Sequence, residues 1–129
     1  MNKVALITGA ARGIGKEIAM TLAEAGFDIA LNYRTKTDEL VELKNSIEEN
    51  KVKCLMVQGD VSKFEDTERI AKETMEEFGK IDVLVNNAGI TRDTLLLRMK
   101  QEDFINVIDV NLVGTFNMTK NVAGYMMKA

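Results

Sequence analysis

The sequence predicts an α/β fold in which helices cover both faces of a parallel sheet. Short apolar runs alternate with longer amphipathic segments along the 129 residues, and a glycine-rich stretch joins the first apolar run to the first amphipathic one. This alternation is typical of βαβ units with right-handed crossovers. We therefore expect one domain, residues 1–129, with four strands in the order 3-2-1-4 across the sheet.

The elements follow one another without a Pro/Gly/Ser-rich linker. Strands are expected at 4–7, 27–33, 52–58 and 81–86, and helices at 14–26, 37–50, 62–79 and from about 101 to the end. Gly26 and Gly79 are expected to end two of the helices, and Ser62 with Glu65 has the spacing of a capping box. The last helix has a possible break near Asn111.

Composition excludes several functions. The net charge of −3 provides no basic surface for nucleic acid or anionic lipid, and no apolar run reaches the roughly 18 residues of a membrane span. The chain has no histidine and one cysteine, Cys54, which lies in an apolar strand pattern. A disulfide within the chain and a zinc site are therefore not expected, and we predict a cytoplasmic protein.

The glycine-rich stretch ITGAARGIGKE lies where the first strand meets the first helix. Gly9, Gly13 and Gly15 permit a tight turn in which backbone N–H groups approach a pyrophosphate at the helix N-terminus. A phosphate-binding P-loop would need glycine and a hydroxyl residue where Ala10 and Glu17 stand. The alternative is a glycine-rich turn with no ligand, but the strand–turn–helix context favours a dinucleotide.

The end of the second strand selects the nucleotide. NAD-binding folds usually have an acid there for the ribose hydroxyls, whereas a 2′-phosphate requires cations. The sequence reads NYRTK, which supplies Arg34 and Lys36, and Arg12 is available from the glycine-rich stretch. The first acid is Asp38, which is expected in the next helix. The pattern favours NADP over NAD.

Three motifs together resemble the short-chain dehydrogenase/reductase family: TGAARGIG (8–15), GDV (59–61) and NNAG (86–89). The stretches NNAGITRDTLLLRM and NLVGTFN are most similar to those of its bacterial 3-oxoacyl-acyl-carrier-protein reductases. The resemblance covers the whole chain. It implies a Rossmann-type fold truncated before the fifth strand, and an NADPH-dependent reduction of an acyl-carrier-protein-linked 3-oxoacyl substrate in fatty-acid synthesis.

The resemblance also implies roles for individual residues. Those expected to bind the cofactor are Gly9, Ala11, Arg12, Gly13, Ile14, Gly15, Arg34, Asp60, Val61, Asn87, Ala88 and Gly89. Asp60 would accept a hydrogen bond from the adenine amino group, beside Val61, and residues 87–89 would follow the nicotinamide ribose. Asn111 matches the asparagine of the family's catalytic group, where it supports a water in a proton relay.

Simpler roles remain open for two of these polar positions. Asp60 could be a turn or cap residue rather than an adenine ligand. Asn86, in the NNAG motif, is interpreted as an amide that braces the sheet.

The chain ends in GYMMKA, where Tyr125 and Lys128 stand three apart. The family uses a tyrosine and a lysine at i+4, with a serine, on later elements. Tyr125 and Lys128 are therefore interpreted as a helix-packing residue and a helix-end residue. The catalytic serine, tyrosine and lysine are expected to be absent from this chain.

Three functions remain to be compared. The first is the cofactor-binding part of a 3-oxoacyl-acyl-carrier-protein reductase, inactive alone. The alternative is a non-catalytic NADP-binding sensor or scaffold module. A phosphoacceptor receiver domain is rejected, because it needs acidic residues where Thr8 and Gly9 stand. A homo-oligomer is expected, formed through the C-terminal helix or the exposed edge of strand 81–86.

Overall fold

The computed structural model describes residues 1–11, 13–90 and 95–129. Its four strands form one parallel sheet in the order β3-β2-β1-β4, which confirms the predicted topology. The strands are β1 (Val4–Ile7), β2 (Asp28–Tyr33), β3 (Cys54–Gln58) and β4 (Val83–Val85). Because all four run in the same direction, the loops after their carboxyl ends meet at one edge of the sheet.

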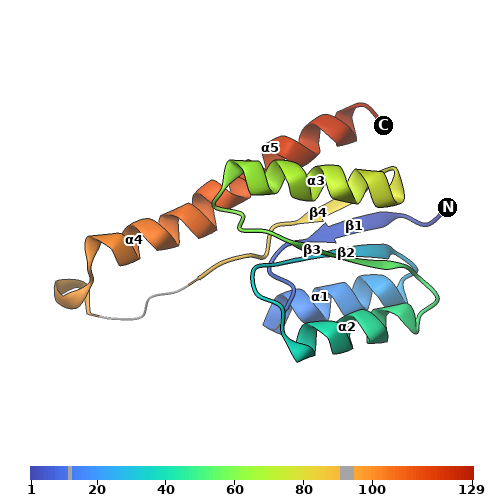
Figure 1. Cartoon of the computed structure of the whole chain (residues 1–129), viewed down its shortest axis with the longest axis horizontal. Helices are drawn as coiled ribbons and strands as arrows, with labels where there is room; N and C mark the ends of the chain where they lie inside the picture. Colours follow the sequence, from blue (N-terminus) through green and yellow to red (C-terminus); the bar gives the residue numbers. More distant parts are fainter. Residues whose placement is uncertain (12, 91–94) are drawn as a thin grey trace.

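Helices cover both faces of this sheet (Figure 1). α1 (Gly13–Glu24) and α2 (Asp38–Glu48) lie on one face, and α3 (Phe64–Phe78) and α5 (Gly114–Met127) lie on the other. β1 separates two cores by its period of two: Val4 and Leu6 pack towards α3 and α5, while Ala5 and Ile7 pack towards α1 and α2. Cys54 is buried in the second core, as its apolar context predicted.

The last helical stretch is interrupted by a π-helical segment, η2 (Asp109–Val113), which joins α4 (Gln101–Ile108) to α5. The possible break near Asn111 is thus a change of helix type, because Asn111 lies within η2. α4 extends beyond the edge of the sheet, preceded by a single 3₁₀ turn, η1 (Leu96–Arg98) (Figure 1). No helix in the described part of the chain is both long and apolar enough to cross a bilayer.

Two predicted strands are shorter in the structure: 52–58 becomes β3 and 81–86 becomes β4. Gly26 and Gly79 follow α1 and α3 with positive φ angles, as expected.

The predicted capping box of Ser62 and Glu65 is wrong. The N-cap of α3 is Lys63, which has no capping side-chain bond. The hydroxyl of Ser62 instead donates to the carboxylate of Asp60, a charged acceptor that forms the stronger hydrogen bond.

Candidate dinucleotide site

A cavity of about 690 Å³ opens where the four strands end. Its lining includes Gly9 and Ala11 after β1, Arg34 after β2, and residues of the loops that follow β3 and β4. The lining residues after β3 and β4 are Gly59, Val61, Ala88, Gly89 and Ile90. Ligands of open parallel sheets bind in this position, outside the carboxyl ends of the strands.

The turn after β1 is held tightly against the loop after β4. The hydroxyl oxygen of Thr8 accepts hydrogen bonds from the backbone N–H groups of Asn87 and Ala88, both at 3.0 Å. Nδ2 of Asn87 donates to the carbonyl oxygen of Gly9 at 3.0 Å. Gly9 has φ +61°, and a Cβ there would stand 2.6 Å from Cα of Ala88. Only glycine fits this position, so the close approach of the two loops depends on it.

The residues of the glycine-rich stretch do not all lie at the cavity. Gly13 begins α1, whose N-terminus carries positive potential suited to an anion. Gly15 is buried close to the carbonyl oxygen of Gly9. Gly13 and Ile14, however, line a separate groove on the outer surface of α1, and Ile14 is 74% exposed. Ile14 therefore does not line the cavity, and Arg12 lies outside the described residues.

Among the described residues that line the cavity, Arg34 is the one with a cationic side chain. Its Nε lies 4.0 Å from Oδ2 of Asp60, and its carbonyl oxygen accepts a 3.1 Å hydrogen bond from Gln58. Asp38 is in the first turn of α2, as expected, but it and Glu39 also line the cavity. The cavity lining therefore carries two carboxylates as well as the guanidinium of Arg34.

Asp60 has the turn role that the sequence left open. Its Oδ1 accepts hydrogen bonds from the backbone N–H of Ser62 at 2.9 Å and from the Ser62 hydroxyl at 2.7 Å, as in an Asx turn. Burial raises the pKa of Asp60, but the hydrogen bonds from Ser62 and the charge of Arg34 outweigh it and hold this pKa below its ordinary value. The carboxylate is therefore ionised near neutral pH, and Oδ2 lies towards Arg34.

Asn111 does not line the cavity, but it bonds to a residue that does. Its Oδ1 accepts from the backbone N–H of Ile90 at 2.8 Å, and its Nδ2 donates to the carbonyl oxygen of Ile90 at 3.0 Å. The side chain therefore fixes Ile90, which lines the cavity. Asn86 was interpreted as an amide that braces the sheet, and this is wrong. Its Nδ2 donates instead to Thr119 on α5 at 3.1 Å.

Two buried polar residues, Thr8 and Asn32, support the site but were not among the residues that the sequence predicted for it. Thr8 clamps the loop after β4, and Asn32 donates to the carbonyl oxygens of Val57 and Gly59, both at 3.2 Å. Asn32 is 2% exposed. A buried polar residue within a strand needs hydrogen-bond partners. The presence of Asn32 in an otherwise apolar strand was the signal that could have identified it.

The parallel sheet and the glycine-bounded cavity at its carboxyl edge define a dinucleotide-binding domain of the Rossmann type. The family model for short chain dehydrogenases matches residues 3–129. The chain belongs to the short-chain dehydrogenase family.

Within this family, the chain is similar to curated 3-oxoacyl-acyl-carrier-protein reductases. The 3-oxoacyl-acyl-carrier-protein reductase FabG of Staphylococcus epidermidis is 44% identical over 99% of this chain and 52% of its own length. The 3-oxoacyl-acyl-carrier-protein reductase of Synechocystis is 47% identical over 98% of this chain and 51% of its own length. The chain therefore spans about half the length of these relatives.

Solved structures have the same fold. A short-chain type dehydrogenase/reductase from Mycobacterium marinum has a TM-score of 0.92 at 35% identity, over 98% of this chain and 51% of the other. An alcohol dehydrogenase from Thermococcus sibiricus, complexed with 5-hydroxy-NADP, has a TM-score of 0.92 at 36% identity. The match covers 99% of this chain and 55% of the other.

Proposed function

We propose that this chain is the NADP-binding part of a 3-oxoacyl-acyl-carrier-protein reductase. The single observation that carries the proposal is the cavity that joins the Gly9 turn to Arg34 at the carboxyl edge of the sheet. The turn suits a pyrophosphate, and Arg34 suits a 2′-phosphate, since a guanidinium forms charge-assisted, often bidentate bonds with phosphates. The similarity to the curated relatives supports the choice of reaction.

The structure passes a simple test of fit for such a cofactor. At Gly9, which lines the cavity, the two loops approach so closely that a side chain would collide with Ala88. Val61 lines the part of the cavity where adenine would lie, with Asp60 beside it. Asn87 is proposed to hold the nicotinamide ribose and Asn111 to hold the wall at Ile90.

When bound, NADPH would supply a hydride to the 3-oxo group of the substrate. The described residues would bind and orient the cofactor: the Gly9 turn and the start of α1 would hold phosphate, and Arg34 would select for the 2′-phosphate. The proposed substrate is an acyl chain linked to acyl carrier protein, and the proposed setting is the cytoplasm. No role in nucleic-acid or membrane binding is proposed.

Calorimetric titration of the chain with 2′,5′-ADP and with 5′-AMP tests the cofactor assignment. We expect a preference of about tenfold for 2′,5′-ADP, since an arginine–phosphate pair is charge-assisted. In Arg34→Ala the two affinities should approach each other. Equal affinities in the wild-type chain would contradict the assignment of Arg34 to the 2′-phosphate.

Lys72→Ala is the matched control. Lys72 is an exposed cation on α3 that does not line the cavity. Its removal changes the net charge by the same amount, so it should leave the preference unchanged. A loss of preference equal to that of Arg34→Ala would mean that overall charge, rather than a defined phosphate site, selects the nucleotide.

A further inference from the structure

The loop that follows β3 is held by side chains from three different elements. Nδ2 of Asn32, on β2, donates to the carbonyl oxygen of Gly59 at 3.2 Å. Oδ2 of Asp66, on α3, accepts from the backbone N–H of Asp60 at 2.9 Å. Nδ2 of Asn117, on α5, donates to the carbonyl oxygen of Val61 at 3.0 Å. Each of three successive residues thus has a backbone group fixed by a side chain.

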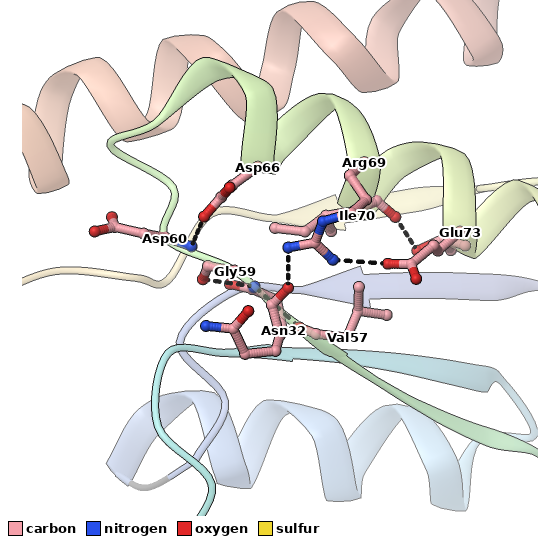
Figure 2. A network of polar contacts seen from close by, with 10 residues as sticks. Asn32, Val57, Gly59, Asp60, Asp66, Arg69, Ile70 and Glu73 are labelled. Carbon is pink, nitrogen blue, oxygen red and sulfur yellow. Dashed lines mark hydrogen bonds and ion pairs between the residues drawn. The ribbon is translucent and has the colours of Figure 1, made fainter.

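These side-chain bonds take over where the pairing of β3 with β2 ends. The N–H of Gly59 still donates to the carbonyl oxygen of Tyr33 at 2.9 Å, but the carbonyl oxygen of Gly59 and the backbone groups of Asp60 and Val61 are bonded by side chains instead. Figure 2 shows Asp66 turned towards the backbone nitrogen of Asp60, while the carboxylate of Asp60 extends away from Asp66. Neither Asp66 nor Asn117 lines the cavity, and Asn117 is 4% exposed. Both lie behind the loop.

The loop also fixes which oxygen of Asp60 can serve a ligand. Ser62 occupies Oδ1 with two hydrogen bonds. Oδ2 has no hydrogen bond among the described residues, and it lies 4.0 Å from Nε of Arg34. An ionised carboxylate is an acceptor only, so Oδ2 is suited to an amino group.

We propose that Asp66 and Asn117 are positioning residues of an adenine subsite formed by Asp60 and Val61. Asp66 holds the backbone of Asp60 so that Oδ2 meets the amino group of the base, and Asn117 holds Val61 against the ring. Neither residue touches the nucleotide. This inference rests on the proposed function, because it requires an adenine nucleotide in the cavity.

The test measures discrimination between two bases. NADPH and its hypoxanthine analogue, reduced nicotinamide hypoxanthine dinucleotide phosphate, differ in that the 6-amino group of adenine becomes a 6-oxo group. The oxo group cannot donate to Asp60, so the wild-type chain should bind NADPH about tenfold more tightly. Asp66→Ala and Asn117→Ala should each reduce this ratio to about twofold or less, because the loop that carries Asp60 and Val61 is released.

Two further variants separate positioning from stability. Asp66→Asn keeps an oxygen that can accept from the N–H of Asp60, so it should restore most of the discrimination. Glu65→Ala removes the same charge from the same first turn of α3, where Glu65 makes no hydrogen bond or ion pair with the described residues. It should retain the wild-type ratio. A loss of discrimination in Glu65→Ala equal to that in Asp66→Ala would overturn the inference.

The outcomes are distinguishable. A wild-type chain that binds neither nucleotide would overturn both the proposed function and this inference. A wild-type chain that binds both equally would remove the contact of Asp60 with adenine, and the inference with it. A wild-type chain that discriminates, with unchanged ratios in Asp66→Ala and Asn117→Ala, would overturn the positioning roles and leave the proposed function intact.

Discussion

Asp82 illustrates how one side chain joins the amino ends of two neighbouring strands, β1 and β4. Its Oδ2 accepts a 2.8 Å hydrogen bond from the backbone N–H of Val4, and its own N–H donates to the carbonyl oxygen of Val4 at 2.8 Å. Lys80 lies 3.2 Å from the same carboxylate oxygen. The bond from Val4 lowers the pKa of Asp82, and Lys80 adds to the effect against burial, which raises it.

This lowered pKa predicts a pH-dependent contribution to stability. Because the pKa in the folded state lies below that in the unfolded chain, the contribution is present above about pH 3.9, the ordinary value for aspartate. It is lost as the pH falls through the folded-state pKa. Asp82→Ala should lower the free energy of unfolding by about 1 kcal/mol at pH 7, measured by urea denaturation. The deficit relative to wild type should shrink in acid.

Glu68→Ala, which removes an exposed carboxylate on α3, is the control for this experiment. It should change the free energy of unfolding little at either pH. A deficit for Asp82→Ala that stays constant from pH 7 into the acid range would show that the charge of Asp82 does not contribute to stability.

At the scale of elements, the stretch from α4 through η2 to α5 is only partly covered by the rest of the molecule. η2 and α5 are buried in the core at Val110, Met118 and Val122, whereas α4 has no buried residue. The stretch exposes large apolar side chains, with Phe104 57%, Leu112 64% and Phe116 61% exposed. Large apolar side chains gathered on one exposed stretch of helix are typical of an interaction surface.

We predict that the chain self-associates through this stretch. Light scattering over a concentration series should show a mass above that of the monomer at high micromolar protein. Phe116→Lys should shift the population towards monomer, because a charge would be buried in the contact.

The matched control is Ile14→Lys, which places the same charge at an exposed apolar residue of α1. It should leave the association unchanged. If the wild-type chain associates and Phe116→Lys does not weaken the association, the edge of the sheet at β4 becomes the expected contact, since an open strand edge recruits other strands. A wild-type monomer at high micromolar concentration would contradict self-association altogether.

At the scale of the whole molecule, the chain spans about half the length of its curated relatives. Tyr125 and Lys128, the pair at the end of the sequence, do not line the cavity. Tyr125 packs against the core and Lys128 caps the end of α5. Their interpretation as a helix-packing residue and a helix-end residue agrees with this placement.

We therefore predict no measurable 3-oxoacyl reductase turnover from residues 1–129 alone. Loss of one general acid typically costs about 10²–10⁴-fold in rate, and the sequence offers no tyrosine–lysine pair at the spacing that the family uses. The measurement is NADPH oxidation with an acetoacetyl thioester. Turnover that co-purifies with the intact mass of this chain would contradict the prediction.

The sequence by itself determined the architecture. Alternating apolar and amphipathic runs, with a glycine-rich stretch after the first strand, predicted the four parallel strands and their order, and the structure confirms both. It also located Gly9, Arg34 and Gly89 at what proved to be one cavity. The strands and the glycine turn could be predicted because each depends on a pattern within a few neighbouring residues, and the strand order follows from the fold class that those patterns indicate.

Only the tertiary structure decided which polar side chains meet. Asn117 bonds to the carbonyl oxygen of Val61, 56 residues away in sequence, and Asn86 bonds to Thr119, 33 residues away. Such partners depend on which groups packing brings within about 3 Å of each other, since hydrogen bonds form only at that range. No local pattern carries that information.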